Sequence, residues 1–258
     1  MNNPLVSTIM PTHNYGQFIE KAIDSVLNQT YPNIELIIVD DASTDQTLKI
    51  IEKYKDKRIT LIQRAECSYS GVVSRNDGMA ISKGVFIAVA DADDISLPDR
   101  FERQVDFFRQ HPQIDLLGGS EQAIDENGES LCQNGNNQPK ISTRPQYPTR
   151  NQYRKAMMKG KNVLLHATLM FRKSILQKLS GYQDCAASGD TEFVMRASRY
   201  FNLYNLNETL VQRRIHPKSV TRTYGKQFRA YYYPIFLMRE HIWTKNEIER
   251  LEKEQGKK

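Results

Sequence analysis

Short apolar runs alternate with segments of helical period through the first half of the chain. The run Glu35–Val39 is β-branched and apolar after its first residue, which is typical of a strand buried on both faces of a parallel sheet. The alternation predicts strands at 5–10, 35–39, 59–62 and 85–90, and helices at 19–27, 43–54, 72–81 and 98–108. Such alternation favours right-handed βαβ units, so we predict an α/β fold with a mostly parallel sheet and helices on both faces.

Two further patterns concern helix ends and the second half of the chain. Ser43, three residues before Gln46, fits a capping box at the start of the second helix. Residues 118–148 are rich in Gly, Asn, Gln and Pro, so loops with short strands are expected there. Beyond them the sequence predicts a strand at 166–171, a helix at about 191–200, short strands near residues 203 and 210, and a helix at 227–254.

Polar residues follow three of the expected strands. The segments are Pro11-Thr12-His13-Asn14, Asp40-Asp41-Ala42-Ser43 and Asp91-Ala92-Asp93-Asp94. In open α/β sheets, ligands bind outside the carboxyl ends of the strands. The sequence therefore predicts a polar and acidic binding site at one edge of the sheet.

The segment Asp91–Asp94 holds three carboxylates, which repel one another unless a cation lies among them. On a turn after a strand they can converge on a hard divalent ion such as Mg²⁺ or Mn²⁺, which keeps open positions for phosphate oxygens. The alternative is a solvated acidic turn in which Asp94 or Asp99 caps the next helix. The position of the triplet after an apolar strand in a βαβ series favours the metal site.

Two other positions carry candidate binding groups. A carboxylate of Asp40 or Asp41 at a strand end can accept the imide N–H of uracil or a ribose hydroxyl, and the alternative is N-capping of the next helix by Asp41 or Ser43. Arg75, within or at the edge of an expected helix, can contact a base or a diphosphate, although a surface ion pair is the simpler interpretation without context.

Charge and composition exclude some classes of protein. The chain has 258 residues and a formal net charge of +6; nine Lys or Arg and five Asp or Glu in residues 222–258 supply +4 of it. The rest is nearly balanced and lacks a nucleic-acid motif, so we exclude nucleic acid as a partner. No apolar stretch approaches the roughly 20 residues of a membrane-spanning helix, and the N-terminus lacks a signal-peptide pattern, so a cytoplasmic location is expected.

Three stretches, taken in this order, resemble glycosyltransferase family 2, whose members have the GT-A fold. VSTIMPTHNYGQFIEKAIDSVLNQTYPNIELIIVDDASTDQT resembles the N-terminus of that family, SRNDGMAISKGVFIAVADADD its Arg-Asn and DxD segments, and GYQDCAASGDTEFVMRAS its acceptor-side segment. The resemblance runs from about Val6 to Thr221. It implies an enzyme that moves a sugar from a nucleotide-sugar donor, with a UDP-sugar favoured, to an acceptor hydroxyl with inversion.

The resemblance also implies a role for each matching position. The residues of the nucleotide-sugar pocket would be Pro11, Thr12, Asn14, Asp40, Asp41, Arg75, Asp91 and Ala92. The ligands of a Mn²⁺ or Mg²⁺ ion would be Asp93, the more direct ligand, together with Asp91 and His216, the last in a loop that closes over the donor phosphates.

Asp190 falls where the family places its catalytic base. The usual Glu-Asp pair is replaced here by Gly189-Asp190, with Glu192 two residues on, so both Asp190 and Glu192 stay open as the base. His166 would lie beside the acceptor, and a structural role is favoured for it. A nucleotidyltransferase ranks low because no Gly-rich phosphate loop follows the first strand, and the retained acids argue against a non-catalytic sugar-binding relative.

The same resemblance divides the chain. Residues 1–221 would form the GT-A catalytic domain, with a nucleotide-binding half at about 1–117 and an acceptor-side half at 118–221, followed by a helical tail at 222–258. The acceptor would be a saccharide or a lipid-linked saccharide of cell-surface glycan synthesis. The aromatic, basic tail suits peripheral contact with the inner face of a membrane, packing onto the catalytic domain or a homodimer, and packing is favoured.

Overall fold

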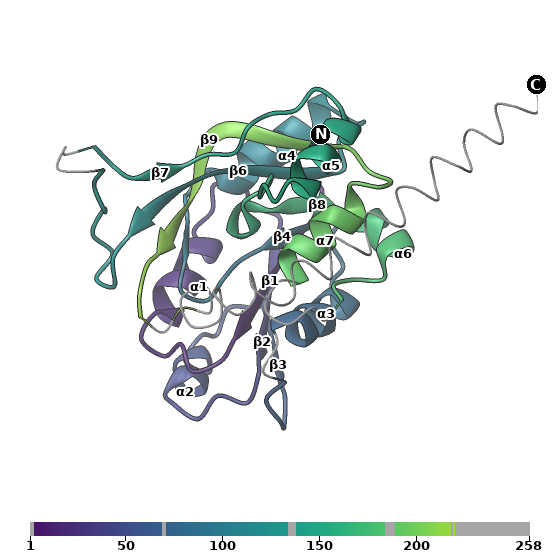
Figure 1. Cartoon of the computed structure of the whole chain (residues 1–258). Helices are drawn as coiled ribbons and strands as arrows, with labels where there is room; N and C mark the ends of the chain where they lie inside the picture. The colour runs from purple at the N-terminus through teal and green to yellow at the C-terminus, as the bar shows by residue number, and fades with distance from the viewer. Residues whose placement is uncertain (1–2, 69–70, 134–137, 184–188, 218, 220–258) are drawn as a thin grey trace, which may run out of the picture.

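The computed structural model describes residues 3–68, 71–133, 138–183, 189–217 and 219. Within them the elements follow in the order β1 (Val6–Thr12), α1 (Ile19–Leu27), β2 (Ile34–Asp40), α2 (Thr47–Ile51), β3 (Ile59–Gln63), α3 (Gly71–Ile81), β4 (Phe86–Val89), β5 (Ile95–Ser96), α4 (Arg100–Gln110), β6 (Leu116–Ile124), β7 (Ile141–Ser142), α5 (Arg150–Met158), β8 (Met170–Arg172), α6 (Leu176–Leu179), α7 (Gly189–Ala197) and β9 (Leu203–Arg214). Short 3₁₀ turns lie at 166–168 and 173–175. Figure 1 shows the arrangement.

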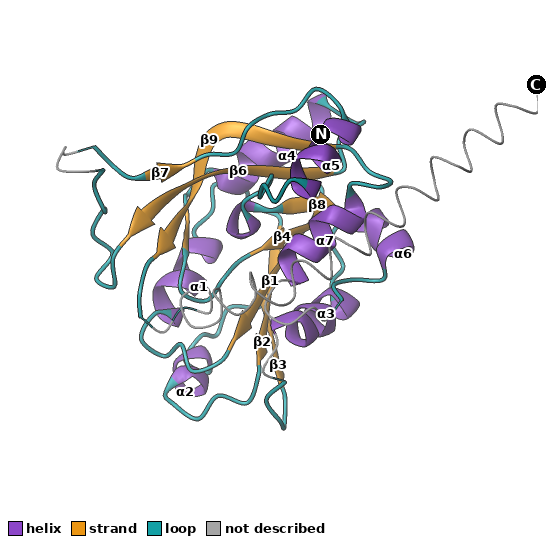
Figure 2. Cartoon of the chain, in the orientation of Figure 1, coloured by secondary structure: helices purple, strands orange, loops and turns teal. Residues whose placement is uncertain are grey.

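The strands of the described residues form one mixed sheet. Their order is β3-β2-β1-β4-β8-β6-β9-β5, and β7 pairs with β6. The first four strands are parallel, as the sequence predicts, and so is the long pair β6–β9. Strand β8 lies antiparallel between these two parallel groups. The sheet therefore runs through both parts of the chain, and residues 117 and 118, where we expected one half to pass into the other, both lie in β6 (Figure 2).

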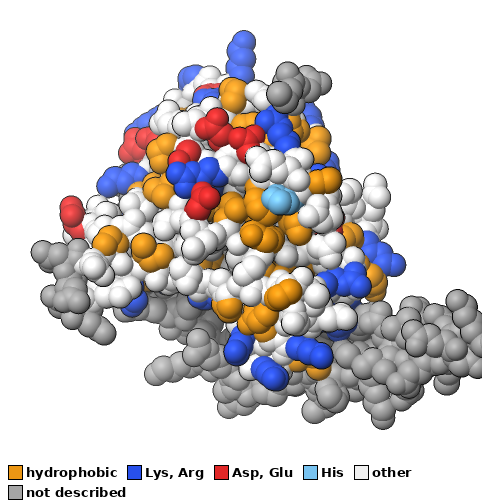
Figure 3. All heavy atoms as spheres, turned by 90° about the horizontal axis from the view of Figure 1, so that it is seen from above, with side chains coloured by type: hydrophobic (Ala, Val, Ile, Leu, Met, Phe, Trp, Pro, Cys, Tyr) orange, Lys and Arg blue, Asp and Glu red, His pale blue; other side chains and the backbone are white. Residues whose placement is uncertain are grey.

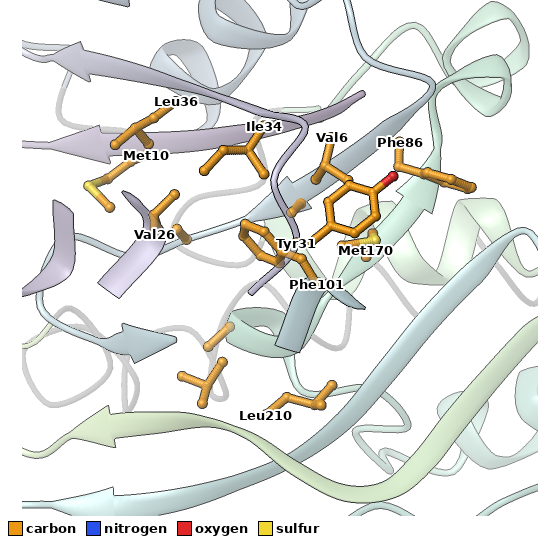
Figure 4. Packing of buried hydrophobic residues seen from close by; sticks show 14 of the residues in the cluster. Val6, Met10, Val26, Tyr31, Ile34, Leu36, Phe86, Phe101, Met170 and Leu210 are labelled. Carbon is orange, nitrogen blue, oxygen red and sulfur yellow. The ribbon is translucent and has the colours of Figure 1, made fainter. Parts of the chain in front are cut away.

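Helices cover both faces of the sheet, because alternate residues of its central strands are buried on opposite sides. Met10 and Ile38 pack with residues of α1, α2 and α4 in one apolar cluster. Ile9 and Ile37 pack with residues of α3, α5, α6 and α7 in the other. Figure 4 shows the first cluster, with Val26 of α1 beside Met10 of β1.

Helix α1 shows how local pattern and packing agree. Its buried residues Ile19, Ala22, Ile23 and Val26 recur at helical spacing and all face the sheet. Burying one Val or Ile side chain contributes roughly 1.5–3 kcal/mol, so this face outweighs the lack of a side-chain cap at its N-terminus.

The structure differs from the sequence prediction at three places. Helix α2 covers only Thr47–Ile51, and Ser43 does not cap it, because the Ser43 hydroxyl accepts the backbone N–H of Asn14 at 2.9 Å. The expected short strands near 203 and 210 are one strand of 12 residues, β9. The expected strand at 166–171 begins as a 3₁₀ turn, and β8 follows it.

No helix in the described part of the chain combines the length and the apolar character needed to cross a bilayer. The tail that we expect to be helical, residues 222–258, lies outside the described residues.

Candidate active site

The carboxyl ends of β2, β1 and β4 meet at one edge of the sheet. Thr12 pairs in register with Asp40, and the N–H of Ala90 donates to the carbonyl of Ile9 at 3.1 Å. The segments after β2 and β4 therefore flank the end of β1 on its two sides. With neighbouring strands about 4.8 Å apart, Asp40 and the acidic turn that starts at Asp91 are separated by roughly 10 Å.

Asp40 offers a free acceptor in a buried position. Its side chain is 1% exposed, and Oδ2 accepts the backbone N–H of Ser43 at 3.0 Å. The other oxygen, Oδ1, is buried and has no hydrogen-bond partner among the described residues, and the same holds for the hydroxyl of Thr12. Buried polar atoms are nearly always paired, so these two groups are suited to a bound ligand.

The side chains of Asn14 and Asp41 hold loops in place. Asn14 has a positive φ of 58°, and its Oδ1 accepts the backbone N–H of Thr44 at 2.8 Å and of Asp45 at 3.2 Å. Asp41 Oδ2 accepts both the backbone N–H of Ser68, at 3.0 Å, and its hydroxyl, at 2.8 Å. The two residues shape the loops around the Asp40 carboxylate and do not present free groups to it.

The acidic turn after β4 is held by three different partners. Arg75 Nη2 donates to Asp91 Oδ1 at 2.7 Å, His216 Nε2 lies 2.9 Å from Asp93 Oδ2, and the backbone N–H of Arg214 donates to Asp94 Oδ1 at 2.8 Å. Arg75 comes from α3, and Arg214 and His216 come from the end of β9 and the residues after it. The turn is therefore the place at which the first and last described parts of the chain meet.

The carboxylates of this turn differ in their pKa values. Burial by itself would raise the pKa of Asp91, but the charge and hydrogen bond of Arg75, together with the charges of His166 and Arg100, hold the pKa below its usual value. Burial, with the nearby charges of Asp93 and Asp91, raises the pKa of Asp94 well above its usual value. Asp91 is thus the carboxylate that balances the charge of Arg75, and Asp94 takes up a proton more readily than an exposed aspartate does.

Arg214 supports the acidic turn from the buried side. Its side chain is 2% exposed, Nε donates to the carbonyl of Asp93 at 2.9 Å, and Nη1 donates to the carbonyls of Asp125 and Glu126 at 2.9 and 2.8 Å. The guanidinium also lies over the ring of Phe18, 5.0 Å from its centroid. One side chain thus ties the acidic turn to the end of β6 and to the segment before α1.

The opposite side of the edge is formed by α7 and the residues before it. Asp190, the second residue of α7, is half-buried, and the backbone N–H of Thr191 donates to its Oδ1 at 2.6 Å. Its charge acts on Arg75, His166 and Tyr182, which places it near the end of β4.

The half-buried His166 and the buried Tyr182 form a pair beside these charges. His166 Nε2 lies 3.0 Å from the Tyr182 hydroxyl. Burial and the charge of Arg75 lower the pKa of His166, so a neutral imidazole that accepts from the hydroxyl is favoured. Asn76 holds Tyr182 through its backbone, accepting its N–H at 2.8 Å and donating to its carbonyl at 2.9 Å.

Glu192 is engaged elsewhere. Its two oxygens accept from Nε and Nη2 of Arg196 at 2.6 and 2.7 Å, and Glu192 is 5% exposed. The same guanidinium donates to the carbonyls of Leu179 and Gly181. Glu192 therefore fixes the turn before α7, and of the two acids only Asp190 presents its carboxylate to the edge of the sheet.

The residues present fit a divalent metal that has few protein ligands. Asp93 and His216 supply an oxygen and a nitrogen donor 2.9 Å apart, whereas Asp91 is engaged with Arg75. No group of three or more His, Cys, Asp or Glu side chains suited to a metal occurs among the described residues. Mg²⁺ is bound in this way in phosphate-transfer sites, through one or two protein groups and the phosphates of the substrate.

The remaining predicted site residues lie at the same edge. Pro11 is half-buried near the end of β1, and Ala92 is 2% exposed and packs into the core below the acidic turn. The sequence pattern did not indicate Tyr15, whose hydroxyl pKa is raised by burial and by the charges of Asp93 and Asp91. It did not indicate Tyr182 or Arg214 either. The signal available for Arg214 was its position at the end of a strand, on the face that packs against apolar residues. The neighbouring Arg213 has the same side chain, so the sequence does not show which of the two arginines is buried.

A family model described as glycosyl transferase family 2 matches residues 7–180. The matched segment contains the site residues from Pro11 to Asp93 and ends before Asp190 and His216. The O-antigen biosynthesis glycosyltransferase WbnJ of Escherichia coli is 31% identical over 229 residues, which cover 85% of this chain and 83% of WbnJ.

Two solved structures share the fold. S. aureus TarS 1–349 in complex with UDP has a TM-score of 0.65 and 24% identity, over 82% of this chain and 61% of that chain. The mannosyltransferase PcManGT from Pyrobaculum calidifontis, in complex with GDP-Man and Mn²⁺, has a TM-score of 0.66 and 18% identity, over 94% of this chain and 65% of that chain. The chain spans less than two thirds of either solved protein. These likenesses confirm the predicted α/β fold.

Proposed function

The chain belongs to glycosyl transferase family 2, and from this we propose that it transfers a sugar from a nucleotide-sugar to a hydroxyl group of a saccharide or lipid-linked saccharide. The observation that carries the proposal is the grouping, at one edge of the sheet, of a buried free acceptor on Asp40, a metal position at Asp93 and His216, and the carboxylate of Asp190. Such a transfer needs these three parts: a pocket for the nucleobase of the donor, a position for its diphosphate, and a proton acceptor for the attacking hydroxyl.

The donor in this proposal is a UDP-sugar. Asp40 Oδ1 is a buried acceptor without a described partner, and the imide N–H of uracil is a donor of matching chemistry. TarS, one of the proteins of like fold, was solved with UDP, and PcManGT was solved with GDP-Man. The shared fold therefore supports a nucleotide-sugar as the donor without specifying its nucleobase. The free acceptor on Asp40 is the reason to favour uracil as that nucleobase.

The metal in this proposal is Mn²⁺ or Mg²⁺, held by Asp93 and His216. When bound, it would supply positive charge to the leaving diphosphate. Arg75 is held by Asp91 in a position from which its guanidinium can add to that charge. Arg214 and Asn14 position the two loops, and Asp41 holds the loop that ends at residue 68.

Asp190 is the base in this proposal. It removes the proton from the acceptor hydroxyl as the oxygen attacks the anomeric carbon, and the nucleoside diphosphate leaves on the other side. A single displacement with one base gives inversion. His166 and Tyr182 form the wall beside Asp190, where the acceptor would enter.

Cell-surface glycan assembly at the cytoplasmic side is the proposed setting. The O-antigen role printed for WbnJ supports it, and so does the breadth of the match to that protein, 85% of this chain.

The experiment is a donor screen with purified protein and Mn²⁺, read out by thermal shift and by release of the nucleoside diphosphate. A ligand that binds the native state raises its apparent stability, so UDP should raise the melting temperature more than GDP or CDP. Asp93→Ala should remove the metal-dependent part of the shift and the activity, whereas the exposed Asp106→Ala should retain both. Equal shifts in melting temperature for the three nucleotides would count against the uracil pocket. Full activity of Asp93→Ala in EDTA would count against the metal site.

A further inference from the structure

A second cavity lies far from the edge described above. It has a volume of about 810 Å³ and lies between the end of α4, the residues before α5 together with the N-terminus of α5, and the amino ends of β6 and β9. Figure 3 looks down on the molecule from the side on which α4 and α5 lie, and shows hydrophobic side chains gathered around a histidine on this face. The cavity includes no residue assigned above to the active site.

The separation of the two sites follows from the length of β9. Leu203, its first residue, lines the cavity, and Arg214, its last residue, holds the acidic turn. These two residues pair with Leu116 and Ile124, the ends of the nine-residue strand β6, which at about 3.3 Å per residue spans roughly 26 Å. The cavity is therefore too distant to share a bound monosaccharide or nucleotide with the active site.

Three aromatic rings cluster in this cavity. Phe107 lies 4.2 Å from His111 and 4.6 Å from Tyr204 between ring centroids, and His111 and Tyr204 are almost parallel, with an interplanar angle of 8°. All three side chains are half-buried, so part of each ring remains accessible. Aromatic rings with an apolar face and a solvent-exposed edge suit ligands in which one small ring carries both C–H and O–H groups.

Two amide side chains are oriented next to these rings. Gln146 Oε1 accepts the Tyr153 hydroxyl at 2.7 Å and the backbone N–H of Asn205 at 2.9 Å, and its NH₂ group has no partner among the described residues. Asn202 Nδ2 donates to the carbonyl of Gln113 at 2.9 Å, and within the described chain its Oδ1 has no partner. The cavity therefore offers one fixed donor and one fixed acceptor, which is a pairing that suits vicinal hydroxyl groups.

The charge of the lining disfavours an ionic ligand. Among the described residues that line the cavity no side chain is acidic, and Arg150 is the single Lys or Arg. A nucleoside diphosphate is normally held by several cations, a metal or a helix N-terminus with free N–H groups. The N-terminus of α5 does border the cavity, but a capping box closes it, in which the Thr149 hydroxyl accepts the backbone N–H of Gln152. The residues that line the cavity thus match a neutral, hydroxylated ligand better than a nucleotide.

We propose that this cavity is a second saccharide-binding site, which holds a neutral sugar unit against Phe107, His111 and Tyr204 and does not take part in transfer. The ring cluster packs against the C–H face of the sugar, and the amides of Gln146 and Asn202 bond its hydroxyls. The site is separate from the proposed donor and acceptor positions and binds sugar without metal or nucleotide. A glycan bound there is retained at the enzyme surface about 25 Å from the point of transfer.

The test uses the full chain and saturation-transfer NMR with three neutral disaccharides: maltose, cellobiose and N,N′-diacetylchitobiose. At least one should give a signal in EDTA, and the signal should persist when Mg²⁺ and saturating UDP are added. His111→Ala and Tyr204→Ala should each weaken binding roughly tenfold, as loss of an anchoring ring does. Gln146→Glu keeps the acceptor used by Tyr153 and Asn205 but removes the donor, and should weaken binding without a change in melting temperature.

The matched control is Tyr200→Ala, which removes a surface ring that is 39% exposed and does not line the cavity. This variant should bind the disaccharide as the unaltered protein does. The proposal is overturned if no disaccharide gives a signal, if UDP displaces the disaccharide, or if the cavity variants bind as well as Tyr200→Ala. Binding of UDP is measured in the same samples, so failure of this site and failure of the proposed transferase function are seen separately.

Discussion

At the scale of single residues, the acids of the active site differ in what they are free to do. Asp190 has one local hydrogen bond from Thr191, whereas both oxygens of Glu192 are taken by Arg196. A general base needs a free lone pair within reach of the hydroxyl that it deprotonates. Substitutions of Asp190 and Glu192 can therefore show which of the two acids is the general base.

We expect Asp190→Asn to lower the rate of sugar transfer roughly 10²–10⁴-fold, because asparagine has the same shape but cannot take the proton. The affinity for UDP and the melting temperature should stay unchanged, as measured by calorimetry and thermal shift. In Glu192→Gln the rate should remain within a few-fold of normal while the protein loses about 1–3 kcal/mol of stability from the weakened bond to Arg196. The reverse pattern of rates would assign the base to Glu192.

Asp40 provides a second test at this scale. In Asp40→Asn the oxygen can stay on the N–H of Ser43, so the new NH₂ group occupies the place of the free Oδ1. A donor then faces the imide N–H of uracil, and the preference for UDP over CDP and GDP should disappear from competition binding. Retention of the full preference would show that the base is read by another residue.

At the scale of secondary structure, β9 matters because its last residue supports the acidic turn. Arg214 makes three hydrogen bonds to backbone carbonyls from two separate segments, and it is almost fully buried. The neighbouring Arg213 instead pairs at 2.6 Å with Glu121, and its side chain is 36% exposed. The two arginines alternate in direction because successive residues of a strand face opposite sides.

Arg214→Lys should therefore be costly, because one ammonium group cannot reach all three carbonyls. We expect a loss of about 2–4 kcal/mol in urea unfolding and a raised KM for the donor as the acidic turn loosens. The control is Arg213→Lys, for which a partly exposed ion pair predicts a change below about 1 kcal/mol. Equal losses in the two variants would mean that the buried guanidinium does not support the turn.

At the scale of the whole molecule, the half-buried His166 makes stability depend on pH. Burial and the charge of Arg75 lower its pKa in the folded state below the unfolded value of 6.5. Below about pH 6.5 the unfolded chain binds a proton that the folded chain does not, so stability falls as the pH is lowered. One such group contributes at most about 1.4 kcal/mol per pH unit.

We expect the stability difference between the unaltered protein and His166→Asn to grow as the pH rises from 5 to 7, measured by urea unfolding at each pH. His111→Asn controls for the loss of a histidine, since His111 lies in the second cavity, away from the Arg75 charge. A difference that stays constant with pH would show that the pKa of His166 is the same in the folded and unfolded states. The raised pKa of Asp94 has the opposite sign, since the folded state then holds the extra proton, and both variants retain it.

Much of the fold was predictable because its signals are local. The apolar runs that became β1, β2 and β4 and the helical spacing of α1 depend on residues fewer than ten positions apart, and the structure confirms them. The second helix is present, but its predicted start at Ser43 was wrong, because the Ser43 hydroxyl accepts from Asn14, 29 positions away, and the helix begins at Thr47. The separate strands near residues 203 and 210 were wrong as well, because pairing with β6 across the molecule extends them into one strand.

The order of the amino acids was enough to indicate that acids gather at the ends of β2 and β4, because strand ends can be read from hydrophobicity alone. Only the folded arrangement distinguished Asp40 from Asp41, Asp190 from Glu192 and Arg214 from Arg213. Each pair consists of similar side chains one or two residues apart, so local patterns treat them alike. Their partners decide between them, and a partner such as Arg214 for the carbonyl of Asp93 lies 121 positions away. Which acid is free and which arginine is buried is therefore a property of tertiary contacts.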